Sequence, residues 1–105
     1  MQPSQKKYPQ KIRNRITKKI QENYGFPEKP LPDYESLINY LDNELENQAS
    51  AFAQGFQSKR LEKTMQVIDK LCKSIPIDET CLNNLRKNNY VKKDSYLDKM
   101  LEETL

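Results

Sequence analysis

Apolar residues recur every three or four positions along most of the chain, a spacing that places them on one face of an α-helix. The first such run has a step of four and consists of Tyr8, Ile12, Ile16, Ile20 and Tyr24. Gly25 follows directly, and glycine readily takes the left-handed conformation that ends many helices. The pattern predicts a helix over residues 9–24, preceded by a flexible polar N-terminus over 1–7.

A proline-rich segment separates this helix from the next one. Three prolines at positions 27, 30 and 32 exclude a helix interior and predict an extended connection over residues 25–32. Phe26 and Leu31 lie within this segment, and we expect their side chains to anchor it on the core.

The longest apolar run keeps the helical spacing for more than twenty residues, and comprises Tyr34, Leu37, Ile38, Leu41, Leu45, Ala49, Phe52 and Phe56. With Asp33 as its N-cap, the run predicts a helix over 33–56. Gly55 leaves open whether residues 33–75 form one helix or two. We take Leu41 and Phe52 as buried, so replacing either with alanine should cost about 2–5 kcal/mol.

Three shorter runs complete the chain. A helix over 58–75 is expected to begin after the N-cap Ser58 and to end before Pro76, and a helix over 78–88 to begin at the N-cap Asp78. The last helix, over 94–105, has Ser95 and Asp98 at the spacing of a capping box. About five helices without a strand predict the all-α class, a small orthogonal or bundle-like domain over 8–105.

Charge is distributed unevenly along the chain, although the net charge is only +3. Residues 1–20 contain seven lysines and arginines and no acid, whereas residues 28–58 contain six acids. A cationic helix can lie along a nucleic-acid backbone, where each neutralised phosphate releases counterions. It can instead dock on an acidic protein surface, or its long side chains can cover the flanks of its own apolar face.

The positive charges of the first helix extend around its axis when residues are placed about 100° apart. That distribution favours sequence-independent phosphate contact over the reading of bases in a groove, and it also suits plain solvation. A second basic cluster begins the helix over 58–75, where lysines oppose the helix dipole. The candidate nucleic-acid-binding residues are Lys7, Lys11, Arg13, Arg15, Lys18, Lys19, Lys59, Arg60 and Lys63.

Two other polar groupings have simpler explanations. Asp42 and Glu46 share one helix face and could hold a divalent cation, but a solvated acidic face explains them better, and no metal site is predicted. Tyr90 lies in a basic loop and could stack on a base, although a role in the core is the better explanation.

Residues 34–72 resemble a histone-fold core. The basic loop Ser58-Lys59-Arg60 follows a long amphipathic helix, and residues 63–71 read Lys-Thr-Met-Gln-Val-Ile-Asp-Lys-Leu, similar to the entry of the third histone-fold helix. The loop is several residues longer than in that family, and Leu61 continues the helical period through it. The resemblance therefore assigns no family.

Catalysis and cofactors find no support in the sequence. The chain has no histidine, the commonest general base near neutral pH, and no glycine-rich phosphate loop. We therefore predict no catalytic residue, no cofactor and no metal. Cys72 and Cys81 fit no zinc-ligand set. A disulfide between neighbouring helices is conceivable, but two reduced thiols, buried or half-buried, are the better expectation.

We expect a non-enzymatic accessory subunit of a nucleoprotein complex. It would contact the nucleic-acid backbone through its basic N-terminal helix and pack on other protein subunits through its long second helix. The alternatives are an adaptor or inhibitor whose basic helix meets an acidic protein, and a homodimer. No membrane span or signal peptide is predicted, and an intracellular location, cytoplasmic or nuclear, is expected.

Overall fold

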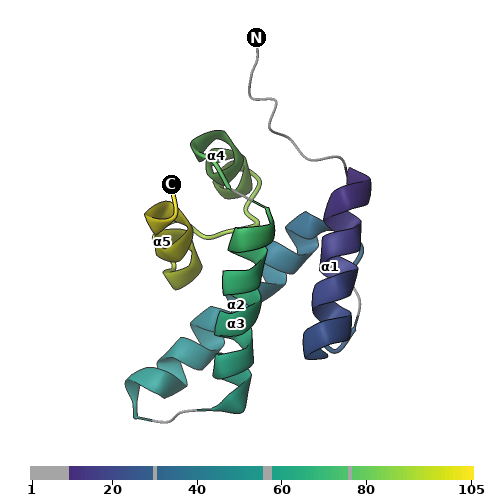
Figure 1. Cartoon of the computed structure of the whole chain (residues 1–105). Helices are drawn as coiled ribbons and strands as arrows, with labels where there is room; N and C mark the ends of the chain where they lie inside the picture. Colours follow the sequence, from purple (N-terminus) through teal and green to yellow (C-terminus); the bar gives the residue numbers. More distant parts are fainter. Residues whose placement is uncertain (1–9, 30, 56–57, 76) are drawn as a thin grey trace.

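The computed structural model describes residues 10–29, 31–55, 58–75 and 77–105. The predicted flexible segment 1–7 lies outside these residues. In the described ranges five helices form, in the order α1 (Gln10–Tyr24), α2 (Tyr34–Ala53), α3 (Lys59–Ser74), α4 (Glu79–Lys87) and α5 (Tyr96–Glu103). Within the described ranges there is no strand, and the predicted all-α class is confirmed (Figure 1).

Side-chain caps fix where the last four helices begin. A carboxylate or hydroxyl oxygen at each cap accepts a hydrogen bond from the backbone N–H three residues later, which satisfies a donor that the helix itself leaves free. The capping residues are Asp33, Ser58, Asp78 and Ser95. All four were identified as candidate caps from the sequence.

Residues 33–75 form two helices and not one. α2 ends at Ala53, three residues before the predicted end, and α3 begins at Lys59. Gly55 has φ +93°, a conformation that glycine adopts at little cost. Figure 1 shows the two helices diverging toward the turn that joins them.

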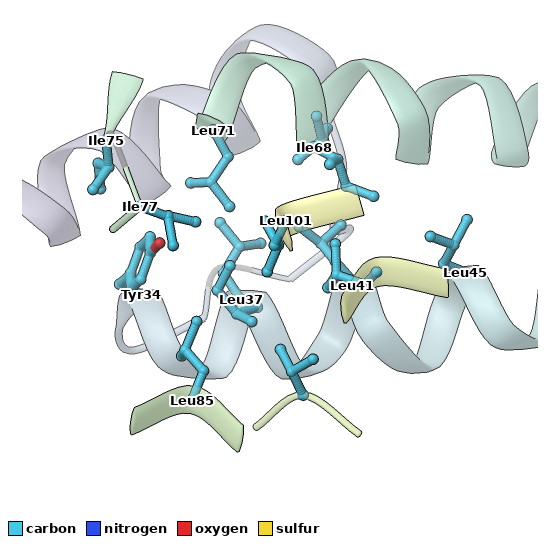
Figure 2. Close-up of a cluster of buried hydrophobic side chains, with 14 of the residues drawn as sticks. Tyr34, Leu37, Leu41, Leu45, Ile68, Leu71, Ile75, Ile77, Leu85 and Leu101 are labelled. Carbon is cyan, nitrogen blue, oxygen red and sulfur yellow. The ribbon is translucent and has the colours of Figure 1, made fainter. Parts of the chain in front are cut away.

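The core is built around α2. This helix contacts α1, α3 and α5, and its row of buried side chains faces Ile68 and Leu71 of α3 and Ile75 just after α3 (Figure 2). Leu85 and Leu101 approach the same row from α4 and α5. α1 lies beside α3 on the other side of the molecule (Figure 1), where its residues Thr17 and Ile20 are buried.

The connection between α1 and α2 is anchored as predicted. Gly25 has φ +65°, and its N–H donates to the carbonyl oxygen of Gln21 at 2.7 Å, which ends α1. Phe26 is only 2% exposed and its ring centroid lies 5.5 Å from that of Tyr40. Leu31 is half-buried against the core.

Phe52, which was expected to be buried, is not in the core. Phe52 lies on the last turn of α2 and is 52% exposed, whereas Leu41 in the middle of α2 is 0% exposed. The periodicity places both on the same face of the helix, but α2 and α3 diverge toward the end of α2 (Figure 1), and Phe52 lies in the last turn of α2. No helix of the described part of the chain is long and apolar enough to cross a membrane.

The two positions therefore predict different stabilities. Leu41→Ala should lower the free energy of unfolding by about 2–5 kcal/mol, because it leaves a cavity in a filled core. Phe52→Ala should lower it by less than about 1 kcal/mol, because the ring is half in water already. Urea denaturation followed by circular dichroism measures both, and a loss of several kcal/mol in Phe52→Ala would contradict the exposed position of this ring.

Candidate nucleic-acid interface

The acidic segment 28–58 is held by hydrogen bonds within the chain, and the expectation that Asp42 and Glu46 form a solvated face is wrong. Each of its six carboxylates accepts a hydrogen bond from another part of this chain. These residues are Glu28, Asp33, Glu35, Asp42, Glu44 and Glu46. Asp33 caps its own helix, and the other five tie α2 or the connection before it to elements distant in the sequence.

Arg60, a predicted nucleic-acid contact, is the partner of two of these carboxylates. Its guanidinium donates to Glu44 and to Glu28, each at 2.6 Å, and to the hydroxyl of Tyr40 at 2.7 Å. It also lies 5.1 Å from the ring centroid of Phe26. These contacts join α3 to α2 and to the connection before α2, so Arg60 is a structural residue and its fork is occupied.

Arg13 is turned inward as well. Its guanidinium donates to Glu35 of α2 at 2.5 Å, with only 16% of the arginine side chain exposed, and lies 4.9 Å from the ring centroid of Tyr34. The ion pair joins α1 to the start of α2. From the helical spacing, Arg13 was expected to be one of several surface cations. Nothing in the sequence indicates that it pairs with Glu35.

Asp42 and Glu46 hold the start of α5. Asp42 is 0% exposed and accepts from the hydroxyl of Ser95 at 2.8 Å and from the N–H of Lys92 at 3.1 Å. Glu46 accepts from the N–H of Tyr96 at 2.9 Å. Both carboxylates are occupied by hydrogen-bond donors. In the described part of the chain, no three His, Cys, Asp or Glu side chains are grouped so that they could hold a metal ion.

A second ion-pair cluster joins α4 to α5. Arg86 donates to Asp98 at 2.6 Å and to Glu102 at 3.0 Å, and Asp98 also accepts from the N–H of Asp94. Burial acts to raise the pKa of Asp98, but these hydrogen bonds outweigh it and the pKa is lowered. Tyr90 packs against the core, so the basic loop contributes a core residue.

The remaining cations of α1 share one face. Lys11, Arg15, Lys18 and Lys19 are all exposed, and at about 100° per residue they lie within an arc of about 100° opposite the buried side of the helix. With Arg13 turned inward, the outer cations form one band, which also contains the exposed Glu22, and they do not surround the helix. No carboxylate of the described ranges forms an ion pair with this band.

α3 adds a second basic edge beside α1. Lys59, Lys63 and Lys70 are exposed and lie within about 40° of one another on the helix. They lie next to the face of α3 from which Arg60 reaches Glu28 in the connection between α1 and α2. α1 and α3 are also in direct contact. We call these three lysines and the four cations of α1 the basic surface.

The nine candidate residues predicted from the sequence lie in different surroundings. Six of the nine are exposed on the basic surface, Arg13 and Arg60 are not free, and Lys7 lies outside the described residues. Lys70 was not among the predicted residues, although its spacing of seven from Lys63 places it on the same edge of a helix.

Comparisons with known proteins add no family to this description. No family model, no curated protein and no solved structure matches the chain. The resemblance of residues 34–72 to a histone-fold core therefore has no support from these comparisons.

The lowered pKa of Asp98 predicts a loss of stability in acid. A carboxyl group whose pKa is lower in the folded state stabilises the fold above its unfolded pKa of about 3.9, and loses that contribution as the pH falls through the folded pKa. The free energy of unfolding of the wild type should therefore fall below about pH 4. Asp98→Asn should show a smaller fall, measured by urea denaturation between pH 2 and 7; equal falls in the two proteins would contradict the assignment.

Proposed function

We propose that this protein binds the sugar-phosphate backbone of nucleic acids through the basic surface, as a non-enzymatic accessory subunit of a nucleoprotein complex. The observation that carries the proposal is the division of charge. The carboxylates of residues 28–58 are engaged inside the chain, while the cations of the basic surface face solvent without a carboxylate partner among the described residues.

The make-up of the basic surface favours sequence-independent contact. Six of its seven residues are lysines, and Arg15 is the single arginine. A lysine ammonium is a compact charge on a flexible stem that suits phosphate, whereas the planar fork of arginine is the commoner reader of guanine edges. Charges spread along two adjacent helices also suit a repeating row of phosphates.

Docking on an acidic protein is the competing function for the same surface. The acidic helix of a second copy is a poor candidate for that partner, because the carboxylates of α2 already accept hydrogen bonds within their own chain. A different acidic protein is still a candidate partner. Competition with a generic polyanion distinguishes it from nucleic acid, because only binding to the phosphate backbone should accept any nucleic acid.

The test is a fluorescence-anisotropy titration of short single- and double-stranded DNA and RNA with the full chain. A variant with glutamine at Lys11, Arg15, Lys18 and Lys19 should bind about 100-fold more weakly or worse at low salt, because four phosphate contacts are lost. Arg13 and Arg60 are left unchanged because their ion pairs stabilise the fold.

The matched control removes the same charge elsewhere. Glutamine at Lys87, Lys92, Lys93 and Lys99, all exposed on or near α4 and α5, should weaken binding much less. Equal weakening in the two variants would mean that only net charge matters. No binding by the wild type at low salt would reject the proposal and favour an acidic protein partner.

A further inference from the structure

An apolar groove lies at the end of the molecule where α2 and α3 diverge. Its volume is about 450 Å³, within the range of sites that receive ligands or partner side chains. Three helices line it, through Leu45 and Phe52 of α2, Leu61 and Met65 of α3, and Tyr96 and Met100 of α5.

Large apolar side chains of the groove remain in water. Phe52, Met65 and Tyr96 are 52%, 39% and 53% exposed, three of the five large hydrophobic residues that the described part of the chain exposes. Solvent-exposed apolar residues gathered on one patch mark an interaction site more often than single ones do. Two methionines and two aromatic rings also give a surface that can adapt to a partner.

The edge of the groove formed by α3 is acidic. Glu62 lines it directly, and Asp69 lies on the same edge of α3, four residues after Met65. On α5, Glu103 lies three residues after Met100, on the same helix face. Glu62 and Glu103 have no ion-pair partner among the described residues, and Asp69 has only the exposed Lys73, a pairing that contributes little.

α3 therefore has one acidic edge and one basic edge, which both run along the helix. Glu62 and Asp69 lie within about 20° of each other beside the groove, and Lys59, Lys63 and Lys70 lie about 90° further round, away from it. A negatively charged partner is repelled at the groove edge, and a positively charged one is attracted. This arrangement sets the groove apart from the basic surface and from any phosphate partner.

We propose that the groove binds a cationic amphipathic helix of another protein. The groove extends from Leu45 to Phe52 along α2, about 10 Å at 1.5 Å per residue, the length over which a helix presents apolar side chains at i, i+4 and i+7. Those side chains fill the space between Phe52, Met65 and Tyr96, and flanking lysines or arginines of the partner meet Glu62 and Glu103. This inference does not rest on the proposed nucleic-acid binding, and the two surfaces can be occupied together.

The partner sequence is unknown, so the probe is a phage-displayed library of random peptides of about 16 residues, long enough for roughly four helical turns. The library is selected on the wild-type chain and counter-selected on a Phe52→Gln/Met65→Gln double variant. Both positions are exposed, so this variant should keep the wild-type circular dichroism spectrum and melting temperature. The selected peptides should carry apolar residues at helical spacing with lysine or arginine beside them.

A synthetic copy of the best peptide is then titrated against single variants. Met65→Gln should weaken binding about tenfold or more, whereas Ile12→Gln, which removes an exposed apolar residue of α1, should leave it unchanged. Glu62→Lys should weaken binding, whereas Glu22→Lys on α1 should not. Glutamine at Lys11, Arg15, Lys18 and Lys19 should leave peptide binding intact, so a failure of the nucleic-acid proposal does not affect this test.

Three results would overturn the inference. No enriched peptide, or only peptides that the double variant still binds, would show that the groove has no helix partner. Enriched sequences rich in aspartate and glutamate would contradict the charge argument. A wild-type dimer in analytical ultracentrifugation that Phe52→Gln dissociates would show that a second copy occupies the groove.

Discussion

The carboxylates of α2 are the groups on which the rest of the structure depends. Glu35 binds α1 through Arg13, Glu44 binds α3 through Arg60, and Asp42 and Glu46 bind the start of α5. A carboxylate taken out of water must be paired or hydrogen-bonded, or it costs several kcal/mol. The apolar face of α2 forms the centre of the core. The carboxylates of α2 require hydrogen-bond donors, so only elements that bring such donors can pack beside this helix.

This requirement also determines the outer charge of the molecule. Arg13 and Arg60 are held by carboxylates of α2, while the lysines of α1 and α3 are left facing solvent. A chain with a net charge of only +3 thus presents a band of positive charge on one side. Glu62 of α3, which has no ion-pair partner among the described residues, lines the apolar groove instead.

The sequence predicted the helices well because their signals are local. Apolar spacing and the capping residues Asp33, Ser58, Asp78 and Ser95 depend only on neighbours within one helical turn. It failed where the outcome depends on contacts between distant residues. Nothing in the sequence indicates that Arg13 pairs with Glu35 or that Arg60 pairs with Glu44. The exposure of Phe52 follows from the divergence of α2 and α3, which the periodicity of one helix does not encode.

The most direct test of the account is the salt dependence of binding between the wild-type chain and a short DNA duplex. If the outward cations contact phosphates, the logarithm of the binding constant should fall linearly with the logarithm of the salt concentration. Its slope should lie between about −4 and −6, because each contact contributes about −0.9. A slope near zero, or no binding at low salt, would contradict the claim that these cations form a nucleic-acid interface.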